Sequence, residues 1–248
     1  MAVHDFSSQR LFLDAPMATG ARLALDRAQA NYLLNVLRLG AGDALLVFNG
    51  RDGEWRGRLE PDGRKSAALA LEEQVRPQPA SRDLAYAFAP LKHARLDYMV
   101  QKAVEMGATA LCPVITRRTQ AARVNAERMR ANAIEAAEQC GILCLPRIDP
   151  DARFDAWLAA VPGDRLLVFC DEDAQGAALP ALAAHAQDGE RPLTLLIGPE
   201  GGFDPAERAA LLQRPNVLRL SLGPRILRAD TAAVAALAVI QAALGDWR

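Results

Sequence analysis

Short apolar runs alternate with longer amphipathic segments throughout residues 82–248. The apolar runs predict strands at 84–89, 110–115, 165–170, 193–197 and 216–220. The segments between them predict helices at 93–106, 126–140, 180–187 and 231–244. Strands that are apolar on both faces are typical of parallel sheets, whose neighbouring strands are joined through helices. The alternation therefore predicts an α/β fold, a parallel sheet with helices on both faces.

A smaller, mainly β unit is predicted before this region. Its strand-like and amphipathic helical segments are, in order, 10–13, 21–25, 27–39, 43–60 and 66–73. Asn49-Gly50 and Asp52-Gly53 stand between alternating apolar positions, which indicates a hairpin. The polar, Pro-containing stretch "RPQPASR" at 76–82 is the best candidate boundary. We therefore expect two domains, 1–76 and 82–248.

The composition permits a substantial core, and the charge is unevenly distributed. The 248 residues are 51% hydrophobic and the net charge is −1, so the chain as a whole is not a polyanion binder. Basic side chains nevertheless outnumber acidic ones in residues 82–130, and acidic ones predominate after them. The middle segment is therefore a candidate polyanion surface that the neutral total hides.

Several classes of protein are excluded by what the sequence lacks. No apolar run approaches the roughly 20 residues of a membrane span, and the first residues lack the apolar region of a signal peptide. The four cysteines have no His or Cys partners at zinc-site spacing, which indicates free thiols in a reducing compartment. We expect a cytoplasmic protein without a metal and without membrane attachment.

The sequence after the predicted strand 193–197 forms a glycine-dense corner, residues 198–204, here called the first corner. Gly198-Pro199-Glu200-Gly201-Gly202 precede Asp204-Pro205, which predicts a helix capped by Asp204 and begun by Pro205. Ligands of parallel α/β sheets lie at the carboxyl ends of strands. No P-loop lysine follows and the spacing is not G-x-G-x-x-G, so a phosphate is disfavoured. A tight turn without any ligand accounts for the same residues.

A second corner, residues 221–228, follows the predicted strand at 216–220 in the same way. Gly223-Pro224 again ends a strand, and a helix opens near Asp230 or Thr231. Two such corners can wall one pocket, in which backbone groups bind a flat heterocycle and Leu222, Ile226 and Leu227 supply apolar contacts. This combination suits an adenosyl group better than a phosphate.

The motifs "IGPEGGFDPAE" and "LSLGPRILRADTA" resemble those of the small-subunit (16S) ribosomal RNA uridine-N3 methyltransferase family, in the SPOUT superfamily. The resemblance runs along the whole chain, through "VLRLGAGDALLVFNGRDGEW", "LKHARLDYMVQKAVEMGATALCPVITRRT" and "RANAIEAAEQCG". It implies an RNA-binding PUA-like β-barrel over 1–76 and a SPOUT-type α/β knot domain, with a deep C-terminal trefoil knot, over 82–248. It also implies a homodimer.

The resemblance further implies S-adenosyl-L-methionine as methyl donor and 16S rRNA of the small ribosomal subunit as substrate. The expected donor-binding residues are Leu196, Ile197, Gly198, Pro199, Glu200, Gly201, Gly202, Leu220, Ser221, Leu222, Gly223, Ile226 and Leu227. The expected RNA-binding residues are Arg10, Arg38, Lys92, Arg95, Arg117, Arg118, Arg123 and Arg225. The expected catalytic residues are Arg228, Asp230 and Glu200.

Methylation of uracil N3 requires loss of the N3 proton, and this requirement explains the catalytic candidates. A carboxylate or a water can accept the proton, while a guanidinium stabilises the resulting anion. Each candidate also has a structural alternative. Asp230 can serve as a helix cap, Glu200 can cap or orient a neighbouring loop, and Arg228 can pair with a carboxylate of the partner subunit. Arg225 can form a structural ion pair, and the basic set can be a solvated face. Two other functions stay open, a SPOUT methyltransferase acting on a ribose 2′-oxygen and an RNA-binding protein without activity.

Overall fold

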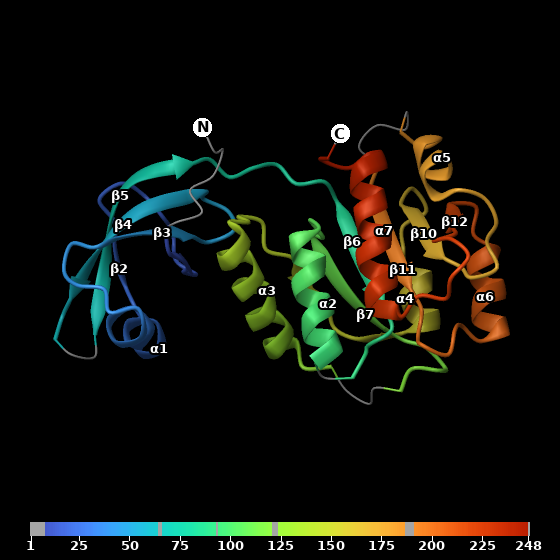
Figure 1. Cartoon of the computed structure of the whole chain (residues 1–248), viewed down its shortest axis with the longest axis horizontal. Helices are drawn as coiled ribbons and strands as arrows, with labels where there is room; N and C mark the ends of the chain where they lie inside the picture. The colour runs from blue at the N-terminus through green and yellow to red at the C-terminus, as the bar shows by residue number, and fades with distance from the viewer. Residues whose placement is uncertain (1–7, 64–65, 93, 121–123, 187–190, 248) are drawn as a thin grey trace. The chain divides into compact units, whose positions relative to one another are not determined.

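The computed structural model describes residues 8–63, 66–92, 94–120, 124–186 and 191–247. The chain divides into two compact units, each with its own sheet (Figure 1). The N-terminal unit comprises Met1–Ala80 together with Ala137–Leu145, and the C-terminal unit comprises Ser81–Ala136 and Pro146–Arg248. The boundary between Ala80 and Ser81 thus falls inside the polar stretch at 76–82. The segment Ala137–Leu145, from later in the chain, belongs to the N-terminal unit.

The N-terminal unit is a five-stranded half-barrel. Its sheet has the order β1-β3-β4-β5-β2, with strands β1 (Arg10–Phe12), β2 (Arg22–Ala24), β3 (Ala44–Phe48), β4 (Glu54–Pro61) and β5 (Ala67–Arg76). β1 runs parallel to β3, and the other pairs are antiparallel. The predicted hairpin is confirmed, since Phe48 pairs with Glu54 across the turn. The predicted helix at 27–39 is shorter: α1 (Arg27–Asn31) passes directly into a π-helix, η1 (Tyr32–Val36).

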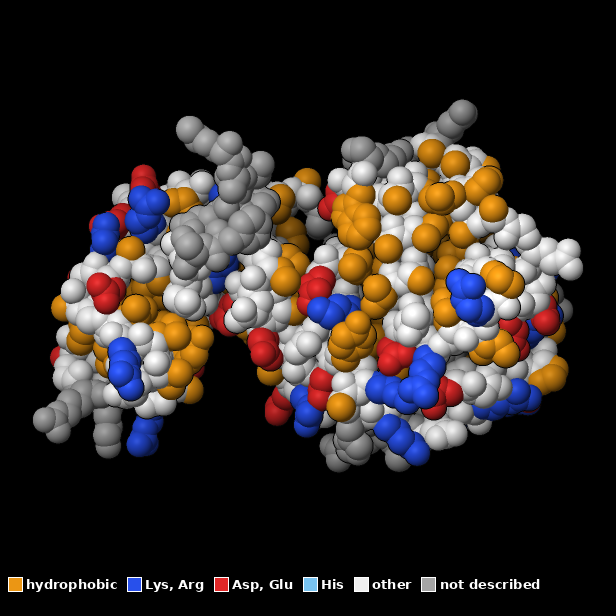
Figure 2. Space-filling model, in the orientation of Figure 1, with side chains coloured by type: hydrophobic (Ala, Val, Ile, Leu, Met, Phe, Trp, Pro, Cys, Tyr) orange, Lys and Arg blue, Asp and Glu red, His pale blue; other side chains and the backbone are white. Residues whose placement is uncertain are grey.

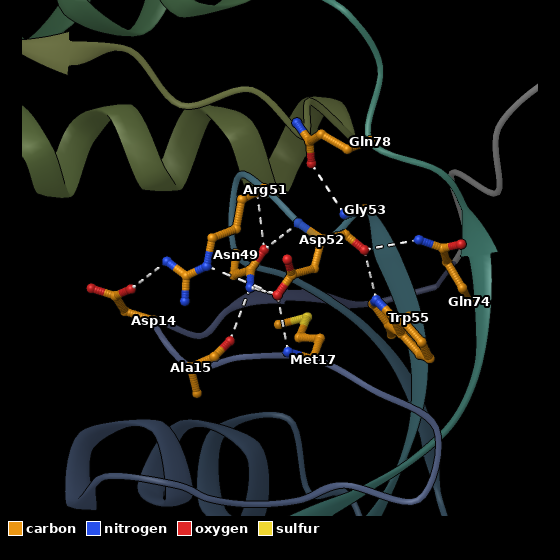
Figure 3. Close-up of polar contacts among 10 residues, drawn as sticks. All are labelled: Asp14, Ala15, Met17, Asn49, Arg51, Asp52, Gly53, Trp55, Gln74 and Gln78. Carbon is orange, nitrogen blue, oxygen red and sulfur yellow. Dashed lines mark hydrogen bonds and ion pairs between the residues drawn. The ribbon is translucent and has the colours of Figure 1, made fainter.

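A polar network fixes the turn between β3 and β4 (Figure 3). The Asp52 carboxylate accepts hydrogen bonds from the Met17 amide at 3.0 Å and from Asn49 Nδ2 at 2.6 Å. These bonds, led by the Met17 amide, lower the pKa of Asp52. Gly53 has φ +78°, and a Cβ there would lie 2.3 Å from the Arg76 carbonyl oxygen. Only glycine fits this position, which is the physical reason for the Asp52-Gly53 turn signal.

A buried ion-pair network in the N-terminal unit contradicts the predicted role of Arg10. Glu54 is 2% exposed and lies between Arg10 and Arg76, with nitrogen–oxygen distances of 2.9 and 2.8 Å. Arg76 also donates to the Gly141 carbonyl oxygen at 2.8 Å. The Arg10 side chain is thus withdrawn from solvent, so the prediction that Arg10 contacts RNA is wrong. A buried charge needs its partner, and here that partner is Glu54.

The C-terminal unit is an α/β structure, as the alternation predicted. Its parallel sheet has the order β12-β10-β11-β6-β7-β8, with β9 pairing β7. The strands are β6 (Leu84–Phe88), β7 (Ala110–Ile115), β8 (Arg147–Ile148), β9 (Ala152–Arg153), β10 (Leu166–Cys170), β11 (Leu193–Ile197) and β12 (Val217–Leu220). The helices are α2 (Ala94–Glu105), α3 (Ala126–Cys140), α4 (Phe154–Ala160), α5 (Ala178–Ala183), α6 (Pro205–Leu212) and α7 (Ala229–Leu244).

Helices cover both faces of this sheet. α2 and α5 pack against α7, which lies on β11, while α4 contacts β7 and α6 on the opposite face (Figure 1). One core cluster joins Phe154 and Leu158 of α4 and Leu211 of α6 to the sheet. Sequence reasoning missed β8, β9 and α4, although Phe154, Trp157 and Leu158 have helical spacing. Within the described residues no helix is long and apolar enough to cross a membrane. The trefoil knot stays a prediction.

Candidate functional site

Three neighbouring strands of the C-terminal sheet end at one cavity. β10 lies between β11 and β12, and all three are parallel, so their carboxyl ends meet at one edge. The cavity at this edge has a volume of about 760 Å³. It is lined by both predicted corners and by the segment 170–176, which begins at the last residue of β10 and is here called the third corner. This is the position at which α/β proteins bind their ligands.

Tight local packing and capping define the first corner. Asp204 caps α6 and forms a capping box with Glu207, as the sequence predicted for a helix beginning at Pro205. A Cβ at Gly198 would lie 2.5 Å from the Phe203 ring. Gly198 is therefore required for packing inside the corner, independently of any ligand.

Three arginines from elsewhere in the C-terminal unit contact the first corner. Arg95, at the start of α2, forms an ion pair with Glu200. After β7, Arg118 donates to the Gly201 carbonyl oxygen at 2.8 Å and Arg117 lies 3.2 Å from the Asp204 carboxylate. The Arg117 amide also donates to buried Glu207, at 2.8 Å. The first corner is thus braced by residues that the sequence analysis assigned to RNA binding.

The second corner has no such braces. Arg225, Ile226 and Arg228 are exposed and line the cavity, and Ile226 is 94% exposed. Neither guanidinium forms an ion pair or hydrogen bond within the described parts of the chain, so pairing of Arg225 inside the chain is not seen. Pairing of Arg228 with a carboxylate of a partner subunit stays an open alternative. α7 begins at Ala229 with Arg228 as its N-cap residue, earlier than predicted. Asp230 lies in the first helical turn, where its carboxylate accepts from the Thr231 amide at 2.9 Å.

The third corner was missed by sequence reasoning. Asp171, 5% exposed, accepts hydrogen bonds from Arg208 of α6 at 2.9 Å and from Arg219 of β12 at 2.7 Å. Burial raises the pKa of Asp171, but hydrogen bonds from Arg208, the Asp173 amide and Arg219 outweigh burial, so the pKa is lowered. Asp171 therefore links the elements that flank the other two corners. The sequence feature that could have identified Asp171 is its position directly after a predicted strand.

Most of the predicted donor-binding residues lie together. All of them line the cavity except Leu196 and Gly201. Leu196 is completely buried in the core, and Gly201 is engaged through its carbonyl oxygen. Cys170 also lines the cavity, but burial raises its pKa to about 12, so its thiol stays neutral. No cluster of His, Cys, Asp and Glu suited to a metal occurs in the part of the chain that the structure describes.

The predicted RNA-binding residues lie in both units. Lys92, Arg117 and Arg118 are exposed on the C-terminal unit and Arg95 is partly exposed there, while Arg38 is exposed on the N-terminal unit. Arg123 lies outside the described residues. The cavity thus has basic side chains around the first corner and at the second, a distribution suited to an anionic polymer.

A strand-end cavity with apolar walls, in an α/β unit that follows a half-barrel, defines the class of RNA methyltransferases with a PUA domain. Residues 78–241 match the family model of an RNA methyltransferase domain, and residues 25–72 match that of an RNA methyltransferase PUA domain. The chain is 30% identical to ribosomal RNA small subunit methyltransferase E of Rickettsia conorii, with 94% of each chain covered.

The corresponding protein of a Synechocystis species is 32% identical, over 95% of this chain and 78% of that one. The crystal structure of ribosomal RNA small subunit methyltransferase E from Neisseria gonorrhoeae, bound to S-adenosyl methionine, superposes with a TM-score of 0.83. Its sequence identity is 25%, with 97% of this chain and 100% of that chain covered. This chain belongs to the ribosomal RNA small subunit methyltransferase E family.

Proposed function

We propose that this protein transfers the methyl group of S-adenosylmethionine to N3 of a specific uridine in 16S rRNA of the small ribosomal subunit. The observation that carries the proposal is the cavity at the ends of β10, β11 and β12, with the free guanidinium of Arg228 on its wall. The donor-bound relative from Neisseria gonorrhoeae supports the choice of donor.

The residues of the cavity fit this donor. Its volume of about 760 Å³ lies in the range of small-molecule sites. Phe169, Leu220, Leu222 and Leu227 offer apolar contacts to a nucleoside, and backbone at Gly223 is open, since a Cβ there meets nothing within 4 Å. When bound, S-adenosylmethionine supplies an electrophilic methyl group on a positively charged sulfur.

The second corner provides the groups that the uracil requires. Arg228 stabilises negative charge on the uracil carbonyl oxygens as the N3 proton leaves. Asp230, two residues further on and partly buried, accepts or relays that proton. Glu200 is the other carboxylate candidate, but its ion pair with Arg95 ties it to the bracing of the first corner. We therefore rank Asp230 above Glu200 as the proton acceptor.

RNA is held, in this proposal, by exposed basic residues around the cavity and on the N-terminal unit. Lys92, Arg95, Arg117, Arg118 and Arg225 neutralise phosphates near the reacting base, and Arg38 neutralises a phosphate at the N-terminal unit. Removal of Arg117 and Arg118 together should weaken RNA binding and flatten its salt dependence.

A homodimer is part of the proposal, and α7 supports it. Figure 2 shows hydrophobic side chains gathered over α7, and Val234, Ala235, Ala238 and Val239 are only partly buried. A helix that is apolar nearly all round is suited to burial on several sides. Light scattering should therefore give twice the chain mass of 26.7 kDa at micromolar concentration.

The test of the activity is mass mapping of methylated nucleosides in 16S rRNA from cells that lack the protein. We expect one 3-methyluridine to disappear and to return with the parent gene, but not with a gene encoding Arg228→Ala. Loss of a ribose-methylated nucleoside instead would replace N3 by a ribose oxygen as the target. An unchanged set of modified nucleosides would overturn the proposal.

A further inference from the structure

The N-terminal unit presents an exposed face on α1 and η1 that its own core does not use. Ala30 and Leu33 point into the core, and Leu34, Leu37 and Leu39 pack partly against it. On the opposite side Tyr32 is 37% and Val36 is 61% exposed. These two residues, four apart on a helix, are neighbours on its surface.

The backbone of this face departs from regular helix. η1 is a π-helix, closed by a hydrogen bond of 2.9 Å from the Leu37 amide to the Tyr32 carbonyl oxygen. Arg38 then adopts φ +58°, and it is the one non-glycine residue in the described chain with positive φ. Single π-turns are rare and frequently occur at functional sites. Because glycine would end the helix there without strain, the arginine side chain has a use that chain reversal does not explain.

The polar groups around Tyr32 match an RNA strand. Arg27 and Arg38, at the two ends of the face, are exposed, and neither forms an ion pair or hydrogen bond with any described residue. Asn35 Nδ2 donates to Asn31 Oδ1 at 2.9 Å, which leaves the NH2 group of Asn31 and the amide oxygen of Asn35 at the surface. The exposed acids Asp26 and Asp43 are engaged locally, since Asp26 accepts from the Gln29 amide and Asp43 from the Gly40 amide.

We propose that the face formed by Arg27, Asn31, Tyr32, Asn35, Val36 and Arg38 is a platform for an unpaired nucleotide of the RNA substrate. The Tyr32 ring stacks on the base, Val36 extends the apolar contact, and the two arginines bind the flanking phosphates. Unpaired bases are recognised by stacking on aromatic rings with amide groups at their edges. This combination favours RNA over a protein partner. The inference deepens the proposed function, on which it rests for the nature of the substrate.

The test compares variants that separate stacking from simple apolar contact. The probe is a single-stranded RNA 12-mer with one 2-aminopurine, whose fluorescence is quenched by stacking. Tyr32→Phe should bind within about twofold of the parent and retain the quenching. Tyr32→Leu should bind between about fivefold and a hundredfold more weakly and lose the quenching. Arg38→Gly, which suits the backbone, should weaken binding and lower the salt slope by roughly 0.7.

Donor binding, measured by calorimetry, serves as the folding control, and all three variants should match the parent. Equal RNA affinity and quenching in Tyr32→Leu and the parent would overturn the platform, and would leave this face to a protein partner. Absence of methyl transfer together with Tyr32-dependent RNA binding would overturn the proposed activity while the platform stands. The two failures are therefore distinguishable.

Discussion

The first and second corners follow β11 and β12 of one sheet, yet they differ in their contacts with the rest of the protein. Arg95, Arg117 and Arg118 contact the first corner, and a capping box fixes its exit. The second corner projects Arg225 and Arg228 without a partner among the described residues, and Arg228 caps α7 without a side-chain hydrogen bond. The charged side chains of the first corner are therefore engaged within the protein, whereas those of the second stay available.

This difference suggests separate roles for the two corners, one in the shape of the cavity and one in contact with a ligand. Because the side chains of Glu200 and Asp204 are engaged by arginines, the first corner is suited to defining the wall of the cavity. An exposed guanidinium without a partner contributes little to folding, so at a cavity it stays available to a ligand. Asp171 connects the two corners, since it binds Arg208 after the first and Arg219 before the second.

The largest effect is expected from Asp171→Asn. The substitution leaves two arginines without their shared carboxylate, and the free energy of unfolding should fall by about 3 kcal/mol. Denaturant unfolding at neutral pH measures this. Asp173→Asn is the matched control, because its side chain is 70% exposed and lies 3.3 Å from Arg208. It should lower the free energy of unfolding by less than about 1 kcal/mol. Equal effects of the two would contradict Asp171 as the link.

The stability difference between the parent and Asp171→Asn should depend on pH. The pKa of Asp171 is lowered from its ordinary value of 3.8, so its contribution to stability is complete above that value. It is lost as the pH falls further, through the folded-state pKa. The unfolding free energies of the parent and Asp171→Asn should therefore differ most near neutrality and converge at acid pH. A constant difference across this range would mean that the charge of Asp171 is not what stabilises the fold.

A smaller effect, on rate rather than stability, is expected from Arg228→Ala. Single-turnover methyl transfer should slow about a hundredfold, as on loss of one charge-stabilising donor. Because the side chain is exposed and unpaired among the described residues, unfolding and donor affinity should barely change. Quenched-flow assays and calorimetry on the same preparation test both statements. A near-normal rate would end the proposed role, and a large loss of stability would show that the second corner is braced after all.

The sequence predicted most of the fold because its strands and helices carry strong local patterns. β11 occupies 193–197 as expected, and α6 begins at Pro205 because Asp204 and Pro205 are local signals. The missed helix α4 is short, and its apolar positions Phe154, Trp157 and Leu158 span little more than one turn. The segment 137–145 groups with the N-terminal unit through partners distant in sequence, such as Arg76. No periodicity encodes such partners.

Sequence analysis predicted the parts of the candidate site that contain a Gly-Pro pair. Both Gly-Pro corners were found because such residues are distinctive at strand ends. The third corner carries no glycine before Gly176 and resembles an ordinary acidic loop, so Asp171 was not noticed. Arg10 was assigned to RNA from the family resemblance, and only the structure revealed its buried partner Glu54. Charge read from sequence does not reveal whether the charge is paired.

The glycines of the two corners offer a finer comparison. Gly198→Ala places a Cβ against the Phe203 ring, and such overpacking should lower the free energy of unfolding by about 2 kcal/mol. Gly223→Ala meets open space but forces φ +98° on alanine, which should lower it by about 1 kcal/mol. Donor affinity should fall in Gly223→Ala, whose methyl group enters the cavity. Thermal unfolding and calorimetry decide, and a reversed order of stability would contradict the packing at the first corner.

The smallest effect is expected from Glu200→Gln, and it tests whether Glu200 is a brace or a base. The Arg95–Glu200 pair is half-exposed, with side-chain exposures of 40% and 47%, so its loss should lower the free energy of unfolding by less than about 1 kcal/mol. The difference should shrink at high salt, because exposed charges are screened. Turnover should stay within severalfold of the parent and keep its pH profile. Asp230→Asn, a substitution of matched chemistry at the second corner, should slow turnover more and flatten the rise of rate with pH. The reverse ranking would assign the proton acceptor to the first corner. The first corner would then take part in the reaction, and the distinction between a corner that shapes the cavity and a corner that supplies reacting groups would fail.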